Sequence, residues 1–248
     1  MKATILALSL VFNLIALSVF GYFLHQKGGL PYLGEKATQT WVSLRGQTAP
    51  AAPATDTSLA TILLLPPETQ RGKPLMQALR ERKSERSFAD RPLTLQELSN
   101  LLWAADGINR KNGGRTAPSA RNVQEFDLYV ILREGIYVYE PKQHHLQPVT
   151  AGDHRKSAGN DGYVATAPLN LIYVADLAKV NWTSDLNVKI RIASLDVGFI
   201  AENVALFCSS EGLNSVPRLS IDTDSLAAIL KLRPEQKIIL ATTVGPPK

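Results

Sequence analysis

The chain has 248 residues, of which 45% are hydrophobic and 20% are charged. This composition excludes an intrinsically disordered protein, and the length suffices for one sizeable domain with an appendage. The net charge of +5 comes from 27 basic and 22 acidic residues, a balance too even for a surface that binds duplex nucleic acid, so no nucleic-acid partner is expected.

The N-terminal stretch, residues 3–24, contains no charged residue. A membrane-spanning helix needs about 20 apolar residues, whereas the apolar part of a signal peptide needs only about 7–15. Because no small-residue cleavage signal follows the apolar end, we favour an uncleaved membrane-anchor helix over a cleaved signal peptide, which would leave a secreted form. The short tail with Lys2 suggests a cytoplasmic N-terminus and an extracytoplasmic, periplasmic domain.

Three regions follow from this pattern. Residues 1–29 form the transmembrane anchor, and residues 30–61 form a linker whose Pro/Ala tract, residues 48–54, is typical of an extended spacer. Residues 62–248 are predicted to form one folded domain.

Residues 63–67 introduce the domain, a short helix is predicted over residues 74–80, and a basic stretch over residues 81–88 follows it. If the helix continues, Arg82 and Arg86 share a face; if the chain is extended, Arg82, Ser84 and Arg86 share a side. Both conformations bring two guanidinium groups together, and arginine suits bidentate phosphate recognition. The alternative interpretation is a solvated, charged helix end.

A second helix begins at the capping box of Thr94 and Glu97 and ends at Gly107. Its apolar residues recur at core-facing spacing, and Trp103 is also interpreted as a core residue.

Strands and helices then alternate without a regular βαβ repeat. Strands are predicted over residues 126–132 and 136–140, as a hairpin, and over residues 171–175 and 237–242; helices are predicted over residues 192–211, ending at Gly212, and 225–232. This order indicates an α+β fold with a mixed or antiparallel central sheet flanked by helices.

The residues themselves show few catalytic signals. No nucleophile elbow, dinucleotide fingerprint or P-loop is present. Asp153, His154 and Arg155 are interpreted as a polar surface segment, and Cys208, within an apolar run, as a buried hydrophobic residue rather than a nucleophile. His144 and His145 are adjacent, which is the wrong spacing for a helical zinc pair, so no metal site is predicted.

Several segments, in order along the chain, resemble one known family. The basic stretch resembles the R-R-S-x-R-x-F opening of the FMN-dependent nitroreductase superfamily, and residues 92–107 and 115–120 are similar to its SagB/ThcOx-type dehydrogenase branch. Shorter matches at residues 167–168, 196–203, 211–213 and 244–245 extend the resemblance over residues 63–248.

The resemblance implies a nitroreductase-like fold that holds FMN non-covalently at a homodimer interface. It assigns the FMN phosphate and ribityl chain to Arg82, Lys83, Ser84 and Arg86, and the flavin surface, from the partner subunit, to Pro118, Ser119, Ala120 and Asn122. Residues 217–220, with Leu219 and Ser220, are expected beside the reactive edge of the ring.

The implied function is a membrane-tethered oxidoreductase that transfers hydride through flavin N5 to or from a small organic substrate, with NAD(P)H as a candidate donor. Such chemistry needs no protein nucleophile. The first alternative is a flavin-binding protein without turnover that relays electrons at the membrane, and the second is a structural domain without a cofactor.

Three positions depart from the family pattern. Glu202 stands where the family usually has glutamine, and Arg121 is expected to narrow or charge the substrate entrance. Lys248 is a candidate substitute for the basic residue that the family often has after the last glycine turn.

Overall fold

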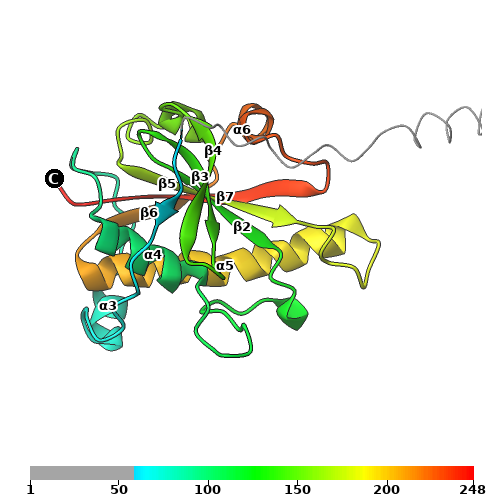
Figure 1. The fold of residues 1–248 in the computed structure, drawn as a ribbon, viewed down its shortest axis with the longest axis horizontal. Coiled ribbons are helices and arrows are strands. Elements are labelled where there is room, and N and C mark those ends of the chain that lie inside the picture. Colours follow the sequence, from blue (N-terminus) through cyan, green and yellow to red (C-terminus); the bar gives the residue numbers. More distant parts are fainter. Residues whose placement is uncertain (1–58) are drawn as a thin grey trace, which may run out of the picture. The chain divides into compact units, whose positions relative to one another are not determined.

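A seven-stranded antiparallel sheet organises residues 59–248, the part of the chain that the computed structural model describes (Figure 1). The strand order is β1-β4-β3-β2-β5-β7-β6, and every neighbouring pair is antiparallel. The strands are β1 (Ile62–Leu63), β2 (Phe126–Ile131), β3 (Gly135–Glu140), β4 (His145–Ala151), β5 (Leu169–Asp176), β6 (Asn214–Arg218) and β7 (Gln236–Gly245). The predicted membrane anchor and nearly all of the predicted linker lie outside the described residues.

The two faces of the sheet bury separate hydrophobic clusters. In β2, Leu128 and Val130 belong to one cluster, whereas Tyr129 and Ile131 belong to the other. This division follows from the alternation of side chains along a strand. Because the central strands are covered on both faces, they consist of nearly continuous apolar residues, and all of β5 is buried.

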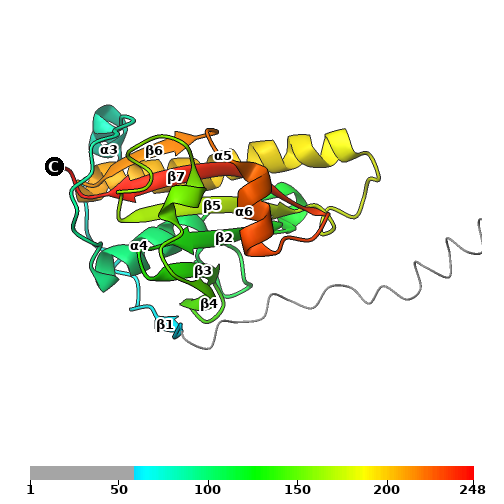
Figure 2. The same cartoon turned by 90° about the horizontal axis from the view of Figure 1, so that it is seen from above.

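The helices cover the sheet unequally, as the two orthogonal views show (Figures 1 and 2). On one face lie α4 (Leu95–Asp106) and the long α5 (Leu186–Glu211), with α3 (Leu75–Glu81) packed against α5. On the other face lie the short 3-10 helix η2 (Arg155–Ala158) and α6 (Thr223–Leu230). The predicted α+β fold with helices flanking the sheet is therefore confirmed, and the sheet is antiparallel rather than mixed.

The helix boundaries follow from local capping interactions. Thr94 accepts a hydrogen bond from the Glu97 N–H, and the Glu97 carboxylate accepts one from the Thr94 N–H, so the predicted capping box is present. Helix α5 ends at Gly212, whose φ of 72° is left-handed as this type of C-cap requires. Its N-cap is Asp185, which accepts from the Asn187 and Val188 N–H groups and starts the helix six residues before the predicted start at residue 192.

Three sequence predictions need correction. Strands β4 and β6 were not predicted, because Pro148 and Pro217 interrupt them and polar residues begin both. Trp103 is half-buried rather than a core residue, because its indole N–H donates to the Ile108 carbonyl at the edge of α4. Arg155 is buried rather than on the surface, and its guanidinium is satisfied by Asp153 and two backbone carbonyl oxygens.

Within residues 59–248, α5 is the one helix long and apolar enough to cross a membrane by length and composition. It packs in the fold against α3, α4, β6 and β7. The burial of Cys208 on this helix, as predicted, agrees with that packing.

Candidate functional site

The basic stretch after α3 is extended, so the helical alternative for it is wrong. Arg82 ends α3 with φ −57° and ψ 125°. The Glu85 N–H then donates to the Ser215 carbonyl at 3.0 Å, and the Asn214 side-chain amide donates to the Ser87 carbonyl at 2.7 Å. The stretch therefore lies beside β6, along the edge of the sheet.

The extended conformation divides its side chains between two sides. The Lys83 ammonium pairs with the Glu85 carboxylate at 2.5 Å, and both residues line a pocket of about 440 Å³ against the C-terminal end of α5. By alternation, Arg82, Ser84 and Arg86 share the opposite side. Three of the four predicted phosphate-binding residues thus share one side of the stretch, and Lys83 lies on the other.

The two arginines on that side are weakly paired. The Arg82 Nε lies 4.0 Å from Glu202 Oε1, at the outer limit of an ion pair, and both side chains are exposed. Arg86 makes no ion pair among the described residues. It faces Asp161 and Tyr163: it helps to lower the pKa of Asp161, whereas the pKa of Tyr163 is raised, mainly by burial, and Arg86 only opposes that rise. Exposed guanidinium groups of this kind remain available to an anion.

Residues 217–220 reach the same place from β6. Leu219 is 76% exposed, and the Ser220 hydroxyl donates to Asp161 Oδ2 at 2.6 Å. This hydrogen bond is the main cause that lowers the pKa of Asp161, with Arg218 and Arg86 acting in the same direction. Two of the three predicted flavin-contacting segments therefore adjoin each other around Asp161.

The third predicted segment lies elsewhere in the same chain. Pro118, Ser119, Ala120 and Asn122 are in or next to the 3-10 helix η1 (Ala120–Asn122), beside the projecting half of α5, whereas α3 and the basic stretch lie near the other end of α5 (Figures 1 and 2). The Ala120 N–H donates to Asp196 Oδ2 at 2.7 Å. Asp196 precedes Glu202 by six residues, or about 9 Å along the helix axis. One chain by itself does not bring the two halves of the predicted site together.

The backbone of this segment is strained. Arg121, Asn122 and Gln124 all have positive φ, at 54°, 55° and 51°. Each such residue costs on the order of 1 kcal/mol or more, and the conformation persists only when its surroundings hold it. Here the Gln124 N–H donates to the Ser119 hydroxyl, and the Arg121 guanidinium lies 4.8 Å from the centre of the Trp182 ring.

Two buried acidic residues lie behind the strained segment. Glu125 is fully buried, and within residues 59–248 its two carboxyl oxygens have no hydrogen-bond partner; burial is the main cause that raises its pKa to about 7, and the carboxyl of Asp196 adds to this. Burial likewise raises the pKa of Asp106 to about 7, against the opposing effect of its ion pair with Arg115. A protonated Glu125 beside Asp196 avoids placing two buried negative charges together.

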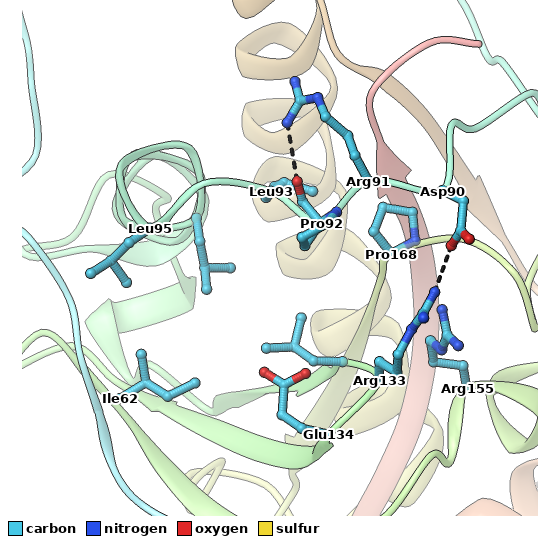
Figure 3. A pocket seen from close by; sticks show the side chains of 12 residues that line it. Ile62, Asp90, Arg91, Pro92, Leu93, Leu95, Arg133, Glu134, Arg155 and Pro168 are labelled. Atoms are coloured by element: carbon cyan, nitrogen blue, oxygen red, sulfur yellow. Dashed lines mark hydrogen bonds and ion pairs between the residues drawn. The ribbon is translucent and has the colours of Figure 1, made fainter.

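A separate pocket of about 390 Å³ lies at the β2–β3 turn and contains none of the predicted site residues (Figure 3). Its floor is apolar, with Leu93, Leu98 and Pro168 among its lining residues. Its three arginines are paired with acids: Arg133 with Asp90 at 2.6 Å, Arg91 with Glu97 at 3.1 Å, and Arg155 with Asp153 at 2.6 Å. Because these charges are already compensated, this pocket is a weaker candidate for anion binding than the Arg82–Arg86 side.

The residues on the Arg82–Arg86 side fit a phosphate-bearing cofactor. Two guanidinium groups and the Ser84 hydroxyl share a side of an exposed segment, and a phosphate group carries about −1.5 to −2 charge. The described residues contain no cluster of three metal-ligating side chains.

Sequence reasoning missed four residues at or behind this site: Asp161, Tyr163, Arg218 as a buried cation, and Asp196 as the acceptor for Ala120. Asp196 offered a signal, because an acid within the apolar face of a helix is seldom buried without a role. Asp161 and Tyr163 lie in a loop without periodicity, and only the tertiary structure brings them to Arg86.

Comparison with known proteins gives consistent matches over the same region. The sequence pattern of the nitroreductase family matches residues 79–246. The chain is 30% identical over 169 residues to a Methanocaldococcus jannaschii protein named as a nitroreductase. The matched region covers 64% of this chain and 85% of that protein.

Solved structures agree. A structure from Ralstonia eutropha JMP134, described as a nitroreductase, has 37% sequence identity and a TM-score of 0.73, covering 82% of this chain and 96% of that one. The NADPH:FMN oxidoreductase of Vibrio harveyi, solved with NAD⁺, has 20% identity and a TM-score of 0.53, covering 70% of this chain and 69% of its own. At that identity the second match shows a shared fold.

Proposed function

This chain belongs to the nitroreductase family and is an oxidoreductase related to flavin-dependent enzymes, and from that premise we propose that it binds FMN and transfers hydride to or from a small organic substrate. The observation that carries the proposal is the shared side of Arg82, Ser84 and Arg86, with weakly paired guanidinium groups next to Leu219 and Ser220. When bound, FMN would supply the hydride chemistry at its N5.

In this proposal each part of the chain has a defined task. Arg82 and Arg86 bind the phosphate, and Ser84 adds a hydrogen bond toward the ribityl chain. Lys83 contributes only long-range charge, because it is paired with Glu85 on the other side. The backbone around Leu219 and Ser220 orients the ring, while Arg121 and Trp182 border the substrate entrance.

We further propose a homodimer, in which Pro118, Ser119, Ala120 and Asn122 of one subunit complete the site of the other. Two observations support it. These residues lie away from Arg82 and Arg86 in one chain, and α5 carries exposed apolar residues suited to an interface, of which Leu195 and Phe199 are four positions apart and share one face. Burial of these two residues would bring the two halves of the site together.

The proposed location is the membrane, through residues 3–24, with the oxidoreductase domain on the extracytoplasmic side. Membership of the SagB/ThcOx-type branch is part of the same proposal and rests on residues 92–107 and 115–120. A reporter fused after Lys248 tests the topology: activity of a periplasm-specific reporter is expected, and activity of a cytoplasm-specific one would reverse the assignment.

The visible spectrum of the full-length protein, purified in detergent, tests the cofactor. The expected result is a yellow protein whose acid-released pigment is FMN. A colourless protein that takes up no added FMN would contradict the proposal. It would favour the alternative interpretation, a structural domain without a cofactor.

Anaerobic mixing with NADH or NADPH then separates an enzyme from an electron relay. Bleaching of the flavin by either donor, followed by reoxidation with a quinone or nitroaromatic compound, is expected for an enzyme. A yellow protein that neither donor bleaches would favour the relay.

The double variant Arg82→Ala/Arg86→Ala tests the assigned residues. Hydrogen bonds to charged groups contribute about 1.5–3 kcal/mol each, so the loss of two is expected to lower FMN affinity by at least about 100-fold. Arg133→Ala/Arg91→Ala, two exposed arginines at the separate pocket, is the matched control and should retain full flavin content. Equal flavin content in both double variants would show that Arg82 and Arg86 do not bind the FMN phosphate.

A further inference from the structure

Arg218 is a buried arginine without a carboxylate partner. It is the last residue of β6, it is 7% exposed, and it makes no ion pair within residues 59–248. The other buried arginine, Arg155, differs in this respect, because Asp153 binds it through two hydrogen bonds of 2.8 and 2.6 Å.

Neutral oxygens satisfy the Arg218 guanidinium instead. Its Nε donates to the Thr243 hydroxyl at 3.0 Å and its Nη2 donates to the Asn170 side-chain oxygen at 3.1 Å. Its Nη1 donates to the Ala158 carbonyl at 2.8 Å and to the Ser220 carbonyl at 3.0 Å. The bonds to Thr243 and Asn170 tie β6 to β7 and β5, and the bond to Ser220 fixes the segment that follows β6.

Gly159 packs closely against this group. A Cβ atom on Gly159 would lie 2.3 Å from Arg218 Nη1 and 2.4 Å from the Ser220 carbonyl oxygen. Asn170 and Thr243 are fully buried, and the Thr243 hydroxyl also donates to the Asn170 side-chain oxygen at 2.7 Å. The guanidinium is therefore held in one position by a closed network of hydrogen bonds.

A buried charge that lacks a counter-ion is costly, and burial lowers the pKa of Arg218. An arginine nonetheless stays protonated in proteins, so the positive charge persists. Its field reaches the candidate site, because Arg218 and Arg86 act together on Asp161 and Tyr163. Among these groups the two arginines outnumber the one carboxylate, Asp161, so a net positive charge remains at the site.

We propose that Arg218 is a positioning residue that fixes the Leu219–Ser220 segment and whose buried positive charge favours the reduced form of the flavin, an inference that rests on the function proposed above. Hydride transfer from C4 of NAD(P)H to flavin N5 leaves NAD(P)⁺ and adds two electrons and one proton, so the ring gains one negative charge until a second proton binds. A fixed cation stabilises that added charge more than the neutral oxidised ring. Only such a difference between the two states shifts their equilibrium.

The test is the midpoint potential of bound FMN, measured by dye-coupled reduction of the full-length protein. Arg218→Gln removes the charge but keeps a donor, and its potential is expected to fall by about 30 mV, which for two electrons corresponds to a tenfold loss of preference for the reduced form. Arg218→Lys keeps the charge but lacks the planar guanidinium group, so the midpoint potential of its bound FMN should fall by less. Arg133→Gln, at an exposed arginine paired with Asp90, should leave the potential unchanged.

A yellow Arg218→Gln protein with the wild-type potential would overturn the inference, even if its KM for an anionic substrate rose, because the charge would then serve the substrate. If Arg218→Gln does not fold, Asn170→Asp places a carboxylate beside Nη2, and it too should lower the potential; an unchanged potential would again overturn the inference. A colourless wild-type protein would instead contradict the proposed function itself, so the two failures are distinguishable.

Discussion

Single residues in this protein are placed by hydrogen bonds that combine distant parts of the chain. Arg86 meets Asp161 and Tyr163 across more than seventy residues of sequence, and Ala120 is held by Asp196 from α5. The most consequential of these contacts involve buried charges, whose desolvation costs exceed those of exposed groups by several kcal/mol. Stability and its dependence on pH should therefore respond to a few identifiable side chains.

Glu125 gives a prediction about pH. Its folded pKa of about 7 exceeds the ordinary value of 4.5, so the folded state binds more protons than the unfolded state between these pH values. Stability should therefore fall as pH rises from about 4.5 to about 7, and the loss is complete above pH 7. The difference of 2.5 units corresponds to an upper bound of about 3 kcal/mol.

Glu125→Gln should remove this part of the pH dependence, because the amide stays neutral and can donate to Asp196. At pH 8 the free energy of unfolding, measured by urea denaturation, should exceed that of the wild-type protein. Asp106 has a raised pKa as well, so the free energy of unfolding of this variant will still depend on pH to some extent. Glu134→Gln, at an exposed position, is the control; a Glu125→Gln protein with the wild-type slope would show that Glu125 is already ionised.

At the scale of elements, local capping signals determine where helices begin and the sheet determines where they pack. Helix α4 begins at Thr94, whose side chain and that of Glu97 satisfy each other's backbone N–H groups. Its buried residues Leu98, Leu101, Leu102 and Ala105 then face the sheet. The capping box thus aligns the first turn of a helix whose stability comes mostly from packing.

Thr94→Ala should lower the free energy of unfolding by about 1 kcal/mol, the usual cost of losing an N-cap oxygen. The change in the urea midpoint at constant slope measures it. Thr94→Ser keeps the hydroxyl and should remain close to the wild-type value. A Thr94→Ala protein as stable as Thr94→Ser would mean that the Glu97 half of the box suffices.

At the scale of the whole molecule, the long helix α5 connects the two halves of the proposed site. Its N-terminal half holds the Ala120 segment through Asp196, and farther along it Glu202 approaches Arg82. Leu195, next to Asp196, and Phe199, between Asp196 and Glu202, are 64% and 48% exposed. A second copy of the chain that covers these two residues would also supply the missing half of the site.

Leu195→Glu/Phe199→Glu should therefore disrupt the dimer and the flavin site together. Unpaired charges buried in an interface cost several kcal/mol, so dimer dissociation should increase on the order of 100-fold or more. Analytical ultracentrifugation measures the mass, and the visible spectrum measures flavin content. Leu63→Glu, at an exposed residue of the edge strand β1, is the matched control and should remain dimeric and yellow.

The α+β class, the caps of α4 and the C-terminal stop of α5 are predictable from the sequence, because they depend on periodicity and on residues within one turn of each other. The sequence also located the basic stretch, since cations four residues apart meet in either local conformation. It did not reveal β4 and β6, because their prolines and polar residues obscure the strand pattern and only neighbouring strands make them pair.

The surroundings of the basic stretch depend on contacts with distant parts of the chain. The hydrogen bond from Glu85 to Ser215 makes the stretch extended, which turns Lys83 away from Arg82 and Arg86. The burial of Arg218 and Glu125 depends on which strands and helices cover them, and no local pattern carries that information. Desolvation acts through this three-dimensional environment, and it is what gives these charged groups their proposed effects on the flavin and on stability.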